Sequence, residues 1–181
     1  MAKSLTDDLL TSNPLQFRFK QNSSCNHALF TLKTVINHYV ANSATVNICA
    51  LDISKTFDRV DHFALLQLLM DKNMSKMFIG VLLDWLLKSF VCVLQWCGTL
   101  SFWYRITAGV RQGGILSPLL FALYMDPLIM RLRALDLGCE LFDNYFECLL
   151  YADDILLMSH TVNAMQRMLA VCDQFAQEFD F

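Results

Sequence analysis

The stretch Tyr151-Ala152-Asp153-Asp154 places two adjacent carboxylates between two apolar runs, residues 146–150 before it and residues 155–158 after it. Apolar runs on both sides of a short polar break predict two strands joined by a tight hairpin turn. Such a hairpin holds backbone and Cβ directions firmly, so neighbouring aspartates can be aimed at a metal ion. The pair is also ordinary turn chemistry, since aspartate bonds its own backbone and tolerates bends. Other parts of the chain must decide between these interpretations.

Length and composition bound the class of protein. A chain of 181 residues with 55% hydrophobic residues is about one domain with a substantial core. Its mean hydropathy of +0.39 is high for a soluble domain, so we expect part of the surface to be covered by another part of a larger protein. The net charge is -3 and the pI about 5.7, so any contact with a polyanion must be local.

Cysteine usage and hydropathy bear on the cellular compartment. The 7 cysteines form no Cys-x-x-Cys pair and are odd in number, which argues against a metal cluster and a disulfide framework. We therefore expect an intracellular protein, in the nucleus or the cytoplasm. No apolar run of a secretory signal follows Lys3. The longest uncharged apolar stretch is interrupted by polar residues and is shorter than the ~18 residues of a membrane span, so we expect no membrane partner.

The N-terminal part of the chain is polar and irregular as far as a first helix. Residues 16–25 alternate aromatic side chains with Arg18 and Lys20, a pattern that suits a phosphate backbone and stacked bases. An edge strand whose aromatic side chains face inward fits this pattern equally well. Beyond it, apolar residues recur every three or four positions, which predicts an amphipathic helix with Ser23 or Ser24 as its cap.

A strand over residues 46–53 then delivers Asp52 at its end. Its nearly continuous apolar run predicts a strand that is buried on both faces. An aspartate after such a strand costs free energy unless it is hydrated, paired or bound to a cation, which makes Asp52 a candidate ligand. The polar turn that follows leads into a helix, and Asp58 or Asp61 is expected to cap it.

The segment Arg111-Gln112-Gly113-Gly114 is the next candidate for chemistry. Its two glycines allow the backbone to approach a ligand closely, although a plain loop is an equally good interpretation. Ser117-Pro118 predicts the cap and first turn of a helix. The remaining pattern predicts a helix over residues 75–89, a hairpin that turns at residues 97–99, the helix from Ser117 to about residue 135, and a final amphipathic helix over residues 162–178.

Three acidic residues therefore arrive from two places in the sequence, Asp52 from one strand and Asp153 with Asp154 from the hairpin. If these strand ends meet, they form a cluster of carboxylates without basic partners, which is stable only when cations neutralise it. Two hard divalent ions ~3.5–4 Å apart can clamp the attacking and leaving oxygens of a phosphoryl displacement. The residues favour nucleotidyl or phosphoryl transfer, and a phosphate-handling α/β domain of another kind stays open.

Three segments in this order resemble motifs A, B and C of reverse transcriptases. They are Leu-Asp-Ile-Ser-Lys-Thr-Phe-Asp at residues 51–58, Arg-Gln-Gly-Gly-Ile-Leu-Ser-Pro-Leu-Leu-Phe at residues 111–121, and Tyr-Ala-Asp-Asp at residues 151–154. The similarity is greatest to the non-LTR (LINE-like) retrotransposon group, with group II intron enzymes next. It covers residues 16–181.

The resemblance implies a fold and a reaction. The fold is α+β, a right-hand polymerase palm in which an antiparallel sheet has helices packed on one face, with partial fingers and no thumb. Residues 1–45 would be the partial fingers and their connection, and residues 46–181 the palm. The reaction is RNA-directed DNA synthesis, in which dNTPs are added to a DNA primer 3′-OH on an RNA template. Two Mg²⁺ ions, which Mn²⁺ can replace, are the implied cofactors.

The resemblance also assigns roles by position. Asp52, Asp153 and Asp154 match the catalytic carboxylates that bind the metal ions. Phe57 matches the bulky residue that excludes ribonucleotides by steric crowding. The other matches are Gln112 and Gly113 for the incoming nucleotide, Tyr151 for the primer end, and Arg18, Lys20 and Arg111 for nucleic acid. Arg18 stands where relatives have glycine, and Lys20 where they have arginine.

The chain departs from the family pattern at both ends. The basic finger motifs are missing upstream, and the chain stops before the later palm lysine, the primer grip and the thumb. Because an acidic palm would hold template and primer poorly, we expect the isolated chain to be weakly active or inactive. Its expected partners include the missing fingers and thumb and an endonuclease domain of a parent polyprotein. Two alternatives stay open: an RNA-dependent RNA polymerase, against which Phe57 argues, and a decayed palm fragment, which the intact aspartates disfavour.

Overall fold

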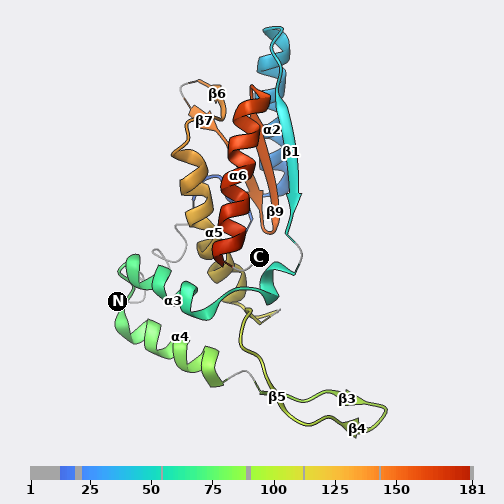
Figure 1. Ribbon diagram of the computed structural model, residues 1–181, viewed down its shortest axis with the longest axis vertical. Coiled ribbons are helices and arrows are strands. Elements are labelled where there is room, and N and C mark those ends of the chain that lie inside the picture. Colours follow the sequence, from blue (N-terminus) through green and yellow to red (C-terminus); the bar gives the residue numbers. More distant parts are fainter. Residues whose placement is uncertain are drawn as a thin grey trace.

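The centre of the molecule is a three-stranded antiparallel sheet in the order β1-β9-β8 (Figure 1). A computed structural model describes residues 13–18, 22–53, 55–88, 91–111, 113–142 and 144–179. The sheet consists of β1 (Asn47–Asp52), β8 (Cys148–Tyr151) and β9 (Asp154–Ser159). Gln16 adds a parallel bridge to Leu150, so the N-terminal segment lies along the outer edge of β8.

The register of the sheet assigns side chains to its two faces. β1 pairs with β9 so that Asp52 lies opposite Asp154 and Cys49 opposite Leu157. β8 pairs with β9 so that Tyr151 also lies opposite Asp154. Because side chains alternate along a strand, Asp52, Tyr151 and Asp154 share one face, and Cys49 and Leu157 share the other.

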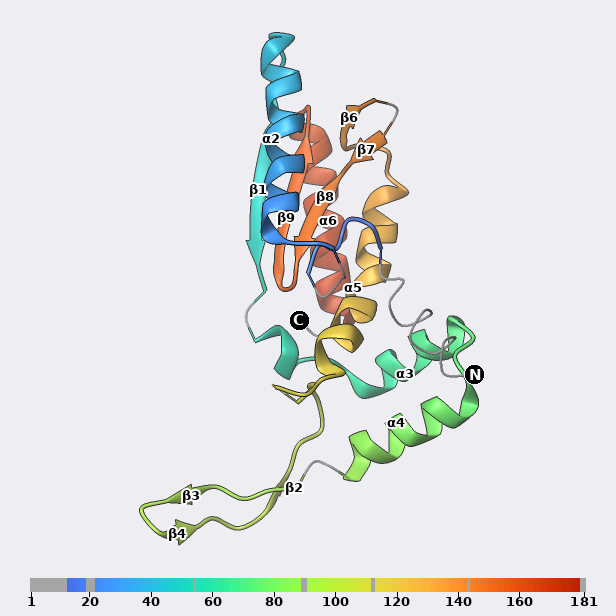
Figure 2. The same ribbon diagram turned by 180° about the vertical axis from the view of Figure 1, so that it is seen from behind.

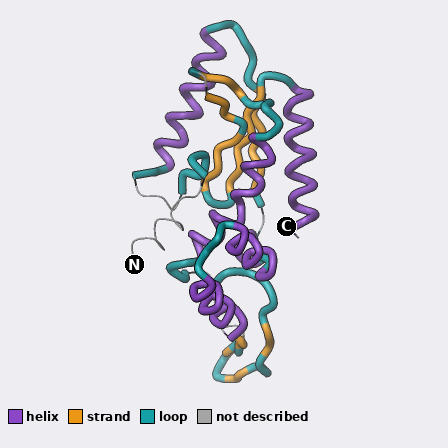
Figure 3. The backbone as a smooth tube through the Cα atoms, turned by 90° about the vertical axis from the view of Figure 1, so that its left-hand side faces the viewer, coloured by secondary structure: helices purple, strands orange, loops and turns teal. Residues whose placement is uncertain are grey.

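Helices lie on both sides of the sheet (Figures 1, 2 and 3). α5 (Ser117–Arg133) and α6 (Val162–Phe179) cover the face that carries Leu157. α6 is amphipathic and buries Met165, Met168 and Phe175 at helical spacing, which explains why it packs there. α2 (Cys25–Ala41) lies on the opposite side and contacts β6 (Cys139–Leu141) and β8. The predicted α+β palm is confirmed, and α2 adds a helix beyond the one covered face that we expected.

The prediction that β1 is buried on both faces is wrong. Cys49 and Leu51 are half-buried, whereas Ile48 is 44% exposed and both Ala50 and Asp52 are exposed. The reason is that β1 is an edge strand whose second face is left open, so its apolar run serves one packed face only.

The part of the chain between β1 and α5 forms a separate lower region and a projecting arm (Figures 1 and 2). Asp61 caps α3 (His62–Asp71) by accepting from the Ala64 N–H at 2.7 Å, as predicted. The other elements here are η1 (Thr56–Asp58), α4 (Lys76–Lys88), β2 (Val91–Cys92), β3 (Gln95–Trp96), β4 (Thr99–Leu100) and β5 (Tyr104–Arg105). The arm, residues 91–105, turns through Cys97 and Gly98 alone, because Trp96 pairs with Thr99.

The remaining elements complete the core. β7 (Asn144–Phe146) pairs with β6 just before the chain enters β8. Most of α5 is buried, including Phe121, Tyr124 and Leu128, so this helix forms the centre of the hydrophobic core. Within the described part of the chain, no helix combines the length and the hydropathy needed to cross a membrane.

Candidate active site

The turn between β8 and β9 presents the two adjacent aspartates. Tyr151 pairs with Asp154, so the turn has two central residues, Ala152 and Asp153. Ala152 has a positive φ of 62, whereas the φ of Asp153 is not positive. This combination is that of a type II′ hairpin turn. A non-glycine residue in this region costs of order 1 kcal/mol and persists only where its surroundings hold it. Ala152 is fully buried, Asp153 is half-buried and Asp154 is exposed.

Asp52 lies directly opposite Asp154 on the neighbouring strand. Cross-strand partners in an antiparallel pair have Cα atoms about 4.5–5.5 Å apart and point to the same face. Two like charges in this position repel each other. No ion pair between either carboxylate and a Lys, Arg or His is found in the described part of the chain. The pair therefore favours a bound cation.

The donor set fits a hard divalent ion, although the side chains do not enclose one. Among the described residues, no three His, Cys, Asp or Glu side chains are grouped so as to hold a metal ion. Mg²⁺ keeps several of its waters and is bound in nucleotide-handling enzymes through one or two carboxylates plus substrate phosphates. Two facing aspartates with only oxygen donors on an open face meet that need. The convergence of Asp153 on the same ions stays a prediction.

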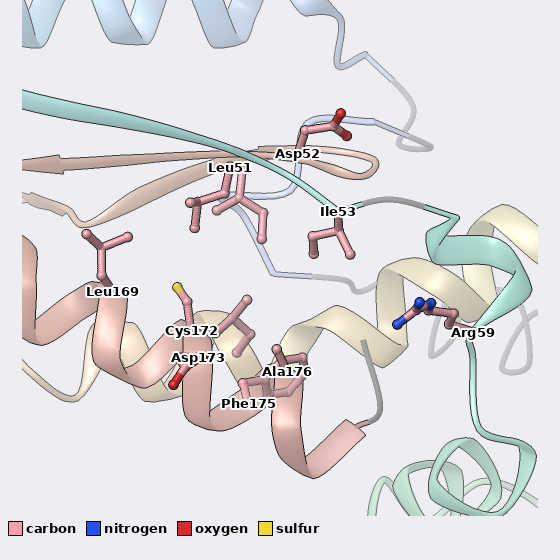
Figure 4. Close-up of a pocket in the computed structure, with 11 residues that line it drawn as sticks. Leu51, Asp52, Ile53, Arg59, Leu169, Cys172, Asp173, Phe175 and Ala176 are labelled. Atoms are coloured by element: carbon pink, nitrogen blue, oxygen red, sulfur yellow. The ribbon is translucent and has the colours of Figure 1, made fainter.

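A cavity of about 480 Å³ lies on the other face of the sheet, between β1 and α6 (Figure 4). Leu51 and Ile53 point toward it, whereas the Asp52 carboxylate points away from it. This follows from the alternation of side chains along β1. The cavity is therefore not the candidate metal site.

Phe57 is fixed against motif B. Its ring centroid lies 4.8 Å from that of Phe121 on α5, and its carbonyl accepts from the Val110 N–H at 2.7 Å. Gly109 has φ 95, and a Cβ there would lie 2.9 Å from Asp58 Cα, so only glycine fits. His62 Nε2 lies 2.7 Å from the Gly109 carbonyl. These contacts of η1 and α3 with residues 109 and 110 were not identified from the sequence.

The loop before α5 is tight at Gly114, whereas the space around Gly113 is open. Gly113 has φ 81, and a Cβ at Gly114 would lie 2.7 Å from Ser117 Oγ. The Ser117 hydroxyl donates to the Arg111 carbonyl at 2.6 Å, and Leu116 holds the N-cap position. The prediction that Ser117 caps the helix is therefore wrong, because its hydroxyl closes the preceding loop instead. The Arg111 side chain is exposed, and Gln112 lies outside the described residues.

The N-terminal segment reaches the turn between β8 and β9. The Arg18 guanidinium lies 5.4 Å from the centroid of the Tyr151 ring, a cation–π contact. Gln16 Oε1 accepts from the Ala152 N–H at 3.3 Å and from the Arg18 N–H at 3.2 Å. Lys20 lies outside the described residues. Sequence reasoning missed Gln16, because no periodicity or spacing marks a contact across 136 positions.

Comparisons with known proteins bear on this site. Residues 1–181 match the family model described as "Reverse transcriptase (RNA-dependent DNA polymerase)". The chain is 32% identical, over 72% of its length, to the "Retrovirus-related Pol polyprotein from type-1 retrotransposable element R2" of Nasonia vitripennis. It is 27% identical, over 87% of its length, to that of the element R2DM of Drosophila melanogaster. The chain spans 13% and 15% of the length of these two relatives.

Solved structures agree on the fold. Apo telomerase from Candida tropicalis superimposes with a TM-score of 0.71 at 14% sequence identity, over 98% of this chain and 34% of that one. Telomerase from Candida albicans in complex with a fragment of telomeric RNA gives a TM-score of 0.64 at 14% identity, over 82% of this chain and 28% of that one.

Proposed function

The chain belongs to the reverse transcriptase family, and from this premise we propose that it is the polymerase core of a non-LTR retroelement protein that copies RNA into DNA. The observation that carries the proposal is the register that sets Asp52 opposite Asp154 beside a strained two-residue turn. The proposed substrates are dNTPs, an RNA template and a DNA primer. The proposed partners are the rest of a longer polyprotein, including fingers, thumb and an endonuclease domain.

Asp52, Asp153 and Asp154 would hold the divalent ions, two Mg²⁺ that Mn²⁺ can replace. When bound, such ions stabilise the charge on the attacking and leaving oxygens of an in-line displacement. The protein itself would fix the directions of these side chains. β1 holds Asp52, and the hairpin of β8 and β9 holds Asp153 and Asp154. Preorganised groups of this kind act without the cost of rearranging during the reaction.

Phe57 would select the sugar of the incoming nucleotide. Its ring is held by Phe121 and its backbone by Val110, so it has little freedom to move away from a ribose 2′ hydroxyl. Gln112 and Gly113 would line the nucleotide in the loop that Ser117 closes. A rigid wall of this kind discriminates by steric exclusion.

Arg18, Lys20 and Arg111 would contact the nucleic-acid backbone, and Tyr151 would support the primer end. The Arg18 contact with Tyr151 supports this placement, because it puts a cation beside the turn on an otherwise acidic molecule. We further propose that residues 1–45 belong to partial fingers and residues 46–181 to the palm.

Primer extension on an RNA template with Mg²⁺ tests the proposal. Asp153→Asn should reduce kcat by ~10³-fold or more, since several kcal/mol of charge stabilisation disappear. Asp71→Asn, an exposed aspartate on α3, is the matched control and should leave kcat unchanged. The assay compares the 181-residue chain with a polypeptide extended at both ends. Calorimetry with Mn²⁺ reports metal binding separately, and equal affinity in wild type and Asp153→Asn would contradict the proposal.

A test of sugar choice separates DNA synthesis from RNA synthesis. Phe57→Ala should admit ribonucleotides, because the ring that crowds the 2′ position is gone. Phe63→Ala, which removes an exposed phenylalanine on α3, is the control. Ribonucleotide incorporation by the wild-type chain at the rate of dNTPs would instead favour an RNA-dependent RNA polymerase.

A further inference from the structure

A buried amide side chain beside the catalytic turn has no role in the function proposed above. Gln16 is 0% exposed and lies in the segment that bridges to Leu150 at the outer edge of β8. On either side of this bridge, the Phe17 N–H donates to the Leu150 carbonyl at 2.9 Å, and the Leu150 N–H donates to the Leu15 carbonyl at 2.9 Å. These two bonds fix the backbone from which the Gln16 side chain extends toward the turn.

The Ala152 N–H depends on this side chain. Ala152 is a central residue of the turn, so it lies outside the ladder whose last pair is Tyr151 with Asp154. It is 0% exposed, and a buried backbone donor needs a partner within the protein. Gln16 Oε1 is that partner, at 3.3 Å. Because Ala152 also has φ 62, the bond acts on the strained residue of the turn.

The two donors fix the orientation of the amide. The N–H groups of Ala152 and Arg18 both face Oε1, so the oxygen must point toward them and the nitrogen away. Nε2 is consequently buried without a partner among the described residues. A glutamate would accept the same bonds, but it would bury an unpartnered carboxylate oxygen in place of the nitrogen and add another carboxyl beside Asp153. A neutral acceptor is therefore the residue type that suits this position.

We infer that Gln16 is a positioning residue, whose side-chain oxygen holds the Ala152 amide and thereby sets the direction in which Asp153 and Asp154 leave the turn. This inference rests on the proposed function, because the direction of the aspartates matters only if they bind the reacting metal ions. Gln16 itself touches no reacting atom and acts through the backbone of Ala152. The N-terminal segment thus contributes to the geometry of motif C as well as to nucleic-acid contact.

Three variants test the inference, each made in the polypeptide extended at both ends that the primer-extension assay uses. Gln16→Met removes the acceptor at similar volume, Gln16→Glu keeps an acceptor oxygen, and Gln174→Met changes an exposed glutamine on α6 as a control. The readouts are hydrogen exchange of the Ala152 amide by NMR, Mn²⁺ affinity by calorimetry, and kcat and KM for dNTP in primer extension. Backbone exchange and a split between kcat and KM separate positioning from general destabilisation.

We expect Gln16→Met to speed exchange at Ala152 while the amides of β9 stay protected. Mn²⁺ affinity and kcat should fall roughly 10- to 100-fold, the usual effect of losing a residue that orients metal ligands. KM for dNTP should stay unchanged, because the nucleotide contacts lie elsewhere. Gln16→Glu should retain protection at Ala152, and Gln174→Met should match the wild type in every readout.

The outcomes are separable. If the wild-type polypeptide extended at both ends neither binds Mn²⁺ nor extends a primer, the proposed function is overturned, and Ala152 exchange then still reports whether Gln16 holds the turn. Wild-type activity with unchanged Mn²⁺ affinity and kcat in Gln16→Met overturns the inference. If Gln16→Met does not fold, Gln16→Glu decides, and loss of Ala152 protection in that variant overturns the inference as well.

Discussion

Two hairpins in the described part of the chain have turns of equal length but different surroundings. The catalytic hairpin, named for its proposed role, joins β8 to β9 through Ala152 and Asp153, and the arm turns through Cys97 and Gly98. In the arm both turn residues have positive φ, 48 and 81, the combination of a type I′ turn, in which glycine is at home. The catalytic turn instead holds an alanine at φ 62. Each turn therefore places one non-glycine residue, Cys97 or Ala152, at a costly positive φ, and of the two only the turn at Ala152 carries carboxylates.

The surroundings explain how this cost is sustained. β8 and β9 are joined by β1 as a third strand and are covered by helices, so Cys148, Leu150 and Leu157 are fully buried. The strands of the arm have two residues each and pair only with each other in the described part of the chain. Trp96 is 82% and Phe102 95% exposed. An isolated two-stranded hairpin is only marginally stable in water. The residues of the catalytic hairpin are therefore held in place by packing against the rest of the chain and not by the hairpin alone.

The largest expected effect comes from the same substitution in each hairpin. Leu157→Ala in β9 should lower the free energy of unfolding by about 2–5 kcal/mol, because it leaves a cavity in a fully buried site. Leu100→Ala in β4, where leucine is 64% exposed, should change it by less than about 0.5 kcal/mol. Urea denaturation followed by circular dichroism measures both, and similar losses would contradict the comparison.

A second test acts at the base of the catalytic hairpin. A Cβ on Gly138 would lie 2.7 Å from the backbone of Phe146 and Glu147, so Gly138→Ala must displace the entry to β8. We expect a loss of about 1–3 kcal/mol, as for overpacking elsewhere. Gly80→Ala is the matched control, because its Cβ meets nothing within 4 Å and α4 gains a better helix former. Its free energy of unfolding should rise by about 0.5–1 kcal/mol. A stable Gly138→Ala variant would show that this entry is less rigid than the strands it feeds.

These two hairpins also show how far sequence reasoning reaches. Both were predicted from alternation and turn residues, and the order of the three motifs identified the family. Local patterns cannot report which face stays open, so the exposure of Ile48 and Ala50 in β1 was missed. Contacts that join distant segments were missed for the same reason, namely the Gln16 bond to Ala152 and the fit of Gly109 against Asp58.

A third test uses pH to probe Glu147, which is 1% exposed at the start of the catalytic hairpin. Both of its carboxylate oxygens lack a partner among the described residues, and burial raises the pKa of the Glu147 carboxyl above its ordinary value of 4.5. Its folded-state pKa exceeds the unfolded one, so the folded chain keeps this proton longer. Stability linked to the carboxyl is therefore full below the ordinary value and is lost as pH rises through the folded-state pKa.

Glu147→Gln removes this dependence. At pH 8 the variant should melt higher than wild type by roughly 2–4 °C, which corresponds to about 1 kcal/mol in a chain of this size. At pH 4 the two should coincide. Glu140→Gln, on the exposed side of β6, is the control and should leave the pH profile of Tm unchanged. A wild-type profile with the opposite slope would mean that a cation or a donor reaches Glu147.

The smallest effect on stability is expected for substitutions in the arm. A stability that does not change there is itself informative. Trp96→Ser and Phe102→Ser should each change the free energy of unfolding by less than about 0.5 kcal/mol, because exposed side chains lose little packing. They should nevertheless reduce binding of a hydrophobic dye and self-association in sedimentation, since contiguous exposed apolar surface drives both. A loss above about 1 kcal/mol would place these rings in a folded contact and remove the contrast between the hairpins. Unchanged stability with lower self-association would mean that the exposed rings of the arm contact other molecules and do not pack within the fold. The catalytic hairpin, in contrast, is stabilised by packing within the chain.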